Sequence, residues 1–211
     1  MARSTIYSFF ILSSLLIHAP AFAQTFFRTW FDAPETVVAG DTFTVDVWAE
    51  TSGEWVGEGD FSSYFHGFLM SAEVLGNLET FSSISEASIY FSYPLSPGTP
   101  EGPRLNDVMA FNLFGFGFNG TMDNPARLFS FDVSTVSGTT GELILLHQPS
   151  SVSPDLLRWY IDPFVGDDWY LGSADDNSVL TTESFTVRVI PTPAAAALLA
   201  FAGLGTLRRQ R

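Results

Sequence analysis

Short runs of alternating hydrophobic and polar residues fill the chain between residues 24 and 189, and clusters of Gly, Pro, Asn, Asp and Ser separate them. A period of two is typical of strands with one buried face, and no run shows convincing helical periodicity. The pattern predicts about nine strands, at residues 26–31, 42–50, 66–75, 87–93, 107–114, 127–135, 142–147, 155–161 and 184–190. We therefore expect an all-β fold, a single antiparallel β-sandwich of two packed sheets.

Three of these runs predict which side chains enter the core. In the clearest of them, residues 42–50, one face is apolar and Trp48 lies on the opposite face. The runs 127–135 and 184–190 alternate in the same way. The predicted core positions are Phe43, Val45, Val47, Phe131, Val133, Phe185, Val187 and Val189.

Two segments break the alternating pattern. Residues 94–103 contain four prolines and two glycines, so we expect a loop without strand character there. Residues 114–120 alternate Phe with Gly. This indicates either a bent strand that packs its rings inward or a loop whose rings stay exposed.

The N-terminus is typical of a secretory signal peptide. Arg3 precedes an apolar run at residues 7–17, and Ala21 and Ala23 form a small-x-small cleavage site before Gln24. We expect cleavage after Ala23, so residues 1–23 would leave the mature protein. The alternative, a buried N-terminal helix, is disfavoured by the proline and the Ala-Phe-Ala sequence that follow the run.

The C-terminus combines three features in order. Pro191, Thr192 and Pro193 precede an apolar run at residues 194–207, and the basic residues Arg208, Arg209 and Arg211 close the chain. This tail resembles the PEP-CTERM sorting signal of bacterial surface and exopolysaccharide-associated proteins, in which Glu stands where this chain has Thr192. The resemblance implies export, transient membrane retention and cleavage near the Pro-x-Pro by an exosortase-type enzyme. It divides the chain into a signal peptide at 1–23, a sandwich domain at 24–189 and a sorting signal at 190–211.

The length of the apolar run agrees with a transient anchor. Residues 194–207, as a helix of about 1.5 Å per residue, would span about 21 Å of a hydrocarbon core that is about 30 Å thick. Extension back to Ile190 gives a marginal span, and the basic end would stay in the cytoplasm. The alternative is a C-terminal helix folded into the soluble domain.

Charge and cysteine content exclude several kinds of function. The chain has 23 acidic and 9 basic residues, a formal net charge of −14, no lysine and no cysteine. Because such an acidic surface repels the phosphate backbone of nucleic acids, we expect no nucleic-acid partner. Disulfides, thiolate metal sites and thiol nucleophiles are unavailable.

No motif for catalysis stands out. After loss of the signal peptide, His66 and His147 are the remaining histidines, and neither has a metal-ligand spacing such as His-x-x-x-His. No Gly-x-Ser-x-Gly elbow or phosphate loop is present. We expect ordinary strand or loop-edge histidines and a protein that is not an enzyme. A secreted glycoside-active hydrolase with paired carboxylates is the second alternative, because sequence does not reveal the separation between carboxylates.

One acidic segment offers hard oxygen ligands of the kind that Ca²⁺ needs. It holds Asp167, Asp168, Asp175 and Asp176 within about ten residues. The spacing matches no EF-hand or nonapeptide repeat, so the favoured interpretation is a solvated acidic loop and no cofactor, with calcium as the alternative.

Four aromatic residues are candidates for contact with a glycan. Trp48 lies opposite the core face of its strand, and Trp55, Trp169 and Tyr170 lie in Gly- and Asp-rich segments. Their rings could stack on sugar faces, which makes a glycan-binding surface domain the first alternative function. Most aromatic residues of a sandwich nevertheless fill its core.

A second resemblance concerns the fold. The Gly-Asp turn and Thr/Val strand of residues 38–48, with residues 126–133 and 138–141, look like strands of cohesin-like or jelly-roll sandwich modules. This supports the fold and does not carry a dockerin-binding function. Together the patterns predict an exported, non-catalytic protein of the bacterial surface or extracellular matrix. Its expected partners are the secretion machinery, an exosortase-type enzyme and, before processing, the membrane, with extracellular polysaccharide as a further candidate.

Overall fold

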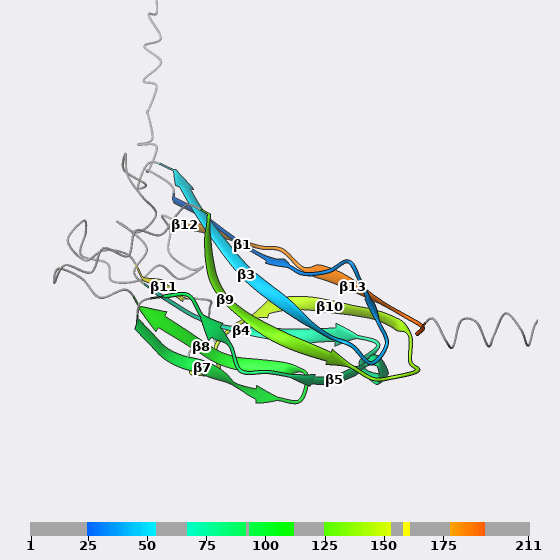
Figure 1. The fold of residues 1–211 in the computed structure, drawn as a ribbon. Coiled ribbons are helices and arrows are strands. Elements are labelled where there is room, and N and C mark those ends of the chain that lie inside the picture. Colours follow the sequence, from blue (N-terminus) through cyan, green and yellow to red (C-terminus); the bar gives the residue numbers. More distant parts are fainter. Residues whose placement is uncertain are drawn as a thin grey trace, which may run out of the picture.

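Two β-sheets pack face to face in the computed structural model (Figure 1), which describes residues 25–53, 67–91, 93–111, 125–152, 158–160 and 178–192. The predicted all-β sandwich is therefore confirmed. A single 3₁₀ turn, η2 (Leu78–Thr80), interrupts the strands described here. Its first residue follows Asn77, whose side-chain oxygen accepts a hydrogen bond from the Glu79 amide.

The first sheet has the order β12-β1-β3-β9-β5, and β6 also pairs with β9. β3 lies in the middle of this sheet and has equally long ladders to β1 and to β9. The strands of this sheet are β1 (Thr25–Asp32), β3 (Thr42–Gly53), β5 (Phe81–Ile84), β6 (Ser88–Ile89), β9 (Ala126–Thr135) and β12 (Ser178–Thr182).

The second sheet has the order β2-β13-β10-β4-β8-β7, and β11 also pairs with β4. The strands of this sheet are β2 (Thr36–Val38), β4 (Gly67–Gly76), β7 (Tyr93–Glu101), β8 (Arg104–Phe111), β10 (Gly141–Gln148), β11 (Arg158–Tyr160) and β13 (Phe185–Ile190).

Two pairings are parallel, whereas the sequence predicted antiparallel sheets. β1 pairs with β12, and β2 pairs with β13. These pairs are parallel because the chain crosses twice from the first sheet to the second on the same side of the sandwich. The chain passes from the first sheet to the second between β1 and β2, and again between β12 and β13. Both segments run in the same direction, so they meet in parallel in each sheet.

The core lies between the two sheets and consists of the alternate, inward-facing side chains. Every predicted core position is buried except Phe185, which is partly buried and packs against the core. The largest fully buried side chains are Phe68, Phe129, Met70, Leu105, Leu128, Leu143, Leu145, Val45 and Val47.

The expected loop at residues 94–103 is wrong over most of its length, because β7 runs from Tyr93 to Glu101. β7 is the last strand of its sheet, so it has only one neighbour, β8. Proline lacks the amide that a ladder needs, and an edge strand tolerates this because one side needs no donors. The predicted strand at 87–93 is likewise divided between β6 in one sheet and the start of β7 in the other.

Several predicted features lie outside the described residues. These are the signal peptide, the Phe-Gly alternation at 114–120 and the tail from Pro193 onward. Within the described part of the chain, no helix is long and apolar enough to span a membrane.

Candidate functional site

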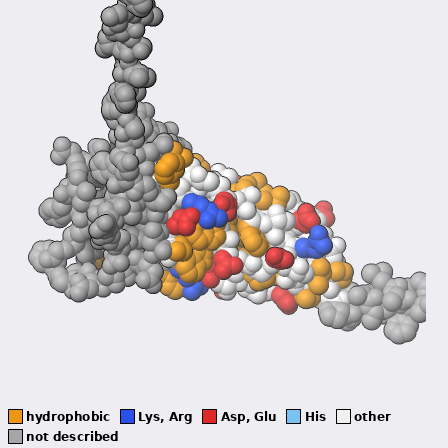
Figure 2. Space-filling view, turned by 90° about the horizontal axis from the view of Figure 1, so that it is seen from above, with side chains coloured by type: hydrophobic (Ala, Val, Ile, Leu, Met, Phe, Trp, Pro, Cys, Tyr) orange, Lys and Arg blue, Asp and Glu red, His pale blue; other side chains and the backbone are white. Residues whose placement is uncertain are grey.

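The outer face of the first sheet carries the most distinctive group of side chains. On β1 the side chains of Phe27, Thr29 and Phe31 are buried, so the alternate residues Arg28 and Trp30 face outward. Figure 2 looks onto the β1 side of the molecule and shows hydrophobic side chains between two groups of charged ones.

Two tryptophans from neighbouring strands form a pair on this face. Trp30 of β1 and Trp48 of β3 are directly opposite each other in the ladder. Their ring centroids lie 6.4 Å apart with planes inclined by 13°, and both side chains are half-buried. The Arg28 guanidinium lies over the Trp30 ring, 4.9 Å from its centroid, in the geometry of a cation–π contact. The face therefore combines two stacked, half-buried indole rings with a cation over one of them.

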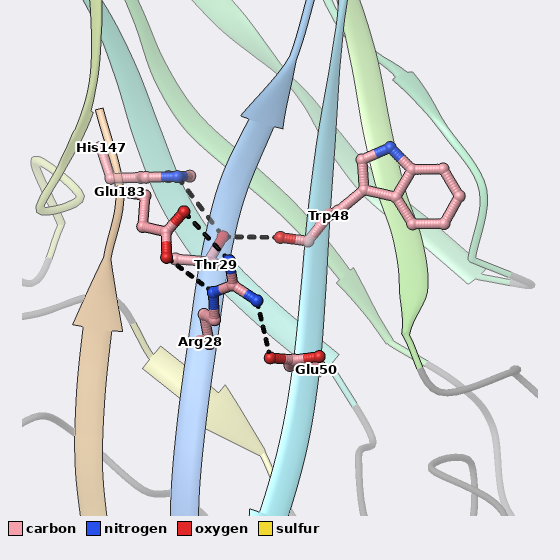
Figure 3. A network of polar contacts seen from close by, with 6 residues as sticks. All are labelled: Arg28, Thr29, Trp48, Glu50, His147 and Glu183. Atoms are coloured by element: carbon pink, nitrogen blue, oxygen red, sulfur yellow. Dashed lines mark hydrogen bonds and ion pairs between the residues drawn. The ribbon is translucent and has the colours of Figure 1, made fainter. Parts of the chain in front are cut away.

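Arg28 of β1 also forms ion pairs with Glu50 of β3 and with Glu183, the residue that follows β12 (Figure 3). Its Nη1 lies 3.0 Å from a carboxylate oxygen of Glu50 and its Nε lies 2.7 Å from one of Glu183. Hydrogen bonds to Glu183 and then to Glu50 raise the pKa of Arg28, and the bond from Arg28 lowers the pKa of Glu183. All three side chains are exposed, so solvent screens the network and its contribution to stability is small.

A second arginine repeats the arrangement two strands away. Arg127 of β9 forms an ion pair with Asp46, and its guanidinium lies 4.1 Å from the centroid of the Tyr90 ring. The Tyr90 hydroxyl lies 3.1 Å from the Ser130 hydroxyl, while 45 % of the Tyr90 residue stays exposed. The outer face thus carries two arginine–aromatic contacts, in which Arg28 is paired with two carboxylates and Arg127 with one.

A polar contact continues beneath this face into the core. The buried Thr29 hydroxyl donates to the Trp48 carbonyl oxygen at 2.9 Å and lies 3.4 Å from Nε2 of His147 (Figure 3). Because the Thr29 proton is used, the geometry favours the His147 tautomer that carries its proton on Nε2. The His147 residue is partly exposed, but its Nδ1 contacts no solvent and has no partner among the described residues.

Burial lowers the pKa of His147 to about 3. The ring is therefore neutral at physiological pH, and its position in the core makes it a packing residue. The prediction of an ordinary strand histidine agrees with this position in β10. His66 lies outside the described residues.

Asp107, on β8 of the second sheet, is another carboxylate whose pKa is lowered, as that of Glu183 is. It has a positive φ of 60° and lies where the register of β4 and β8 shifts. It accepts hydrogen bonds from the Ser150 hydroxyl at 2.5 Å, from the Ser151 amide at 2.7 Å and from the Ser151 hydroxyl. Burial acts to raise the pKa of Asp107, but these bonds outweigh it and hold the pKa below its usual value. Asp107 fixes the segment after β10 rather than presenting a reactive group.

Few of the predicted site residues fall in the described part of the chain. Trp48 is outward-facing as predicted, and Pro191 and Thr192 follow β13 directly. No group of three or more His, Cys, Asp or Glu side chains gathers to hold a metal among the described residues. The predicted residues outside this part are Ala21, Ala23, Gln24, Trp55, Asp167, Asp168, Tyr170, Trp169, Asp175, Asp176, Pro193, Arg208, Arg209 and Arg211.

Sequence reasoning missed the partners of Trp48. Trp30 and Arg28 join it only through the pairing of β1 with β3, which is a property of the ladder register. The available signal was the alternation Phe26, Arg28, Trp30 on β1, which places three large side chains on one face.

No family model matches this chain. No curated protein matches its sequence either. Among solved structures, the chain is similar to the third cohesin ScaC from Acetivibrio cellulolyticus, solved in complex with the ScaB dockerin. The identity is 9 %, the match covers 79 % of this chain and 99 % of that chain, and the TM-score is 0.43.

Proposed function

We propose that this protein is an exported, non-catalytic β-sandwich module of the bacterial surface or extracellular matrix, delivered by a C-terminal sorting signal of the exosortase type. The secretion machinery and a processing enzyme would act on its two ends. The mature sandwich would remain at the cell surface or in the matrix.

The observation that carries this proposal is the place of the sandwich between the two predicted processing sites. β1 begins at Thr25, immediately after Gln24, and β13 ends at Ile190, immediately before Pro191. The Ile190 carbonyl accepts a hydrogen bond of 2.8 Å from the Ala39 amide, so the last strand residue is held in the fold. Cleavage after Ala23 and near Pro191 would thus leave every described strand intact.

The two ends of the sandwich also suit a tethered module. The start of β1 and the end of β13 lie at opposite ends of the sheets (Figure 1). A chain held at Pro191 would present the end that contains Thr25 away from the membrane.

The test is mass spectrometry of the full-length protein expressed in its own host. We expect an N-terminus at Gln24, a C-terminus at or near Pro191 to Pro193, and recovery from the surface or matrix fraction. Joint replacement of Pro191 and Pro193 by Ala should leave the tail uncut and the protein in the membrane. Replacement of the exposed Pro34 and Pro100 by Ala is the matched control and should not alter processing. A cytoplasmic protein with both ends intact would contradict the proposal.

The pairing of three described carboxylates with arginines supports a non-catalytic role. Glu50 and Glu183 bind Arg28, and Asp46 binds Arg127. The pKa of Glu183 is lowered, whereas a general acid for glycoside hydrolysis needs a raised pKa. The lowered pKa of Glu183 therefore favours a non-catalytic function over a secreted glycoside hydrolase.

A glycan-binding role is the second candidate, favoured by the Trp30–Trp48 pair. A neutral sugar suits this face because its arginines are already paired and the chain is strongly acidic. We expect Trp48→Ala to reduce retention on an immobilised host polysaccharide, by about tenfold for the loss of one stacked ring. Phe81→Ala, at a partly buried position away from the pair, controls for loss of stability. Equal retention of the wild type and the Trp48 variant would remove this candidate.

A further inference from the structure

The edges that the described strands leave open are not equally protected. An edge strand exposes unpaired amide and carbonyl groups that can pair with another strand, and folded proteins block this with prolines, charges, bulges or short strands. Among the described strands, the edges are β12 and the β5/β6 side in the first sheet, and β2, β7 and β11 in the second.

All of these edges except β12 carry such devices. β7 contains Pro94, Pro97 and Pro100, and β2 and β11 have only three residues each. β5 and β6 have four and two residues, with a register shift between Phe81 and Ser83. The Ala87 amide also donates to the Pro97 carbonyl at 2.7 Å, which links the β6 side to β7.

β12 has none of these devices. Its five residues read Ser-Val-Leu-Thr-Thr, without charge, proline or glycine. Its ladder to β1 is unbroken from Ser178 opposite Thr25 to Thr182 opposite Thr29. Thr181 and Thr182 are exposed, and in the described part of the chain no strand lies on the outer side of β12.

The direction of the free backbone groups follows from one hydrogen bond. The Glu183 amide donates to the Thr29 carbonyl of β1 at 2.9 Å. Since backbone groups alternate along a strand, Thr181 and Val179 also face β1, whereas Ser178, Leu180 and Thr182 face outward. In the part of the chain that the structure describes, these three residues have no backbone partner on the outer side of β12.

Charge does not prevent two such edges from meeting. Although the chain carries a net charge of −14, β12 is uncharged, and the Glu183 carboxylate at its end is paired with Arg28. A strand that pairs with its own copy about a twofold axis must run antiparallel to it. If the twofold axis passes through Leu180, Leu180 pairs with Leu180 of the second copy and Ser178 pairs with Thr182 of the second copy. No charged residues then lie opposite each other.

We propose that β12 pairs antiparallel with β12 of a second copy of this chain, joining the two first sheets into one continuous sheet. About six backbone hydrogen bonds would form, because Ser178, Leu180 and Thr182 each contribute an amide and a carbonyl. The interface is small, so the dimer is weak in dilute solution and is promoted where copies are concentrated.

The test uses the full chain in detergent, where the absence of native cysteine makes a single introduced thiol specific. Oxidation of Leu180→Cys should yield a covalent dimer, because paired antiparallel residues on the axis lie about 5.5 Å apart, within disulfide range. Leu95→Cys on the proline-containing β7 edge, 48 % exposed, is the matched control and should cross-link at least about tenfold less.

A second variant distinguishes edge pairing from contact between tails. Thr182→Pro removes an outward amide but leaves the bond from Glu183 to β1, and it should reduce cross-linking of Leu180→Cys by about tenfold. Thermal unfolding confirms that this variant folds. Equal cross-linking at positions 180 and 95, or no effect of Thr182→Pro in a folded protein, would overturn the proposal.

Discussion

The rings of Phe31 and His147 lie nearly parallel across the two sheets, with centroids 4.1 Å apart and planes inclined by 17°. Phe31 comes from β1 of the first sheet and His147 from β10 of the second. The only described histidine is therefore part of the contact between sheets. A charge on this ring would be placed against an aromatic core residue.

This contact predicts that mild acid destabilises the protein. The native ring of His147 stays neutral down to a pKa of about 3, whereas in the unfolded chain His147 is protonated with a pKa near 6.5. Between these values the unfolded state binds more protons, so the free energy of unfolding falls as pH falls. From pH 7.5 to pH 5.5 we expect a loss of about 1.4 kcal/mol, measured by urea denaturation.

His147→Phe is the matching variant, because it keeps a ring against Phe31 and removes the titration. Its stability should change less than that of the wild type over the same pH interval. If both proteins lose equal stability between pH 7.5 and pH 5.5, His147 is not the group responsible.

Gly76 should tolerate no side chain. Its φ is +99°, and a Cβ there would lie 2.4 Å from the Glu142 carbonyl oxygen of the neighbouring strand. Gly76→Ala therefore combines an unfavourable backbone with a clash against a fixed ladder, and should cost about 3 kcal/mol or more of unfolding free energy. Gly102→Ala is the control, with φ of +58° and no atom within 4 Å, and should cost only about 1 kcal/mol. Similar losses would contradict this account.

Asp107 should be replaceable by Asn more easily than by Ala. Asn tolerates the positive φ and keeps an acceptor for Ser150 and Ser151, so Asp107→Asn should cost about 1 kcal/mol. Ala neither tolerates the positive φ nor accepts these hydrogen bonds, so Asp107→Ala should lower the free energy of unfolding by about 3 kcal/mol, measured by denaturant titration. Because the native pKa of Asp107 is lowered, its contribution is present above the unfolded pKa and is lost as pH falls below about 4. Neither variant should show this loss; equal costs would refute the backbone argument.

The prolines of β7 should keep that edge from associating. Joint replacement of Pro94, Pro97 and Pro100 by Thr would restore three amides to an exposed strand. We expect faster aggregation on warming, followed by light scattering, than in the wild type. Pro34→Thr, outside the strands, provides the comparison. Unchanged aggregation of the triple variant would show that another feature protects this edge.

The sandwich and its central strands were predictable because their alternation is local. Phe43, Val45 and Val47 enter the core as their period of two indicates. β7 was not predictable in this way, because a rule against proline applies to strands with two neighbours and the sequence does not reveal which strands have one. The parallel pairs were missed since they depend on the path between sheets.

In the candidate site, too, features that depend on a single strand were predictable and contacts between strands were not. The outward direction of Trp48 follows from its own strand. Its contact with Trp30, and that of Arg28 with Glu183, join residues far apart in sequence, so they depend on the register between strands. The burial of His147 likewise required the position of Phe31 in the opposite sheet.

The position of β13 has a mechanical consequence. β13 leads directly into Pro191 and is bonded to β10 on one side and to β2 on the other. A force applied to the chain at Pro191, with the far end of the sandwich held, acts along these strands. The hydrogen bonds of both ladders then bear the load together in shear instead of opening one after another. A module attached through this strand would resist extension by flow or by the growth of the surface around it.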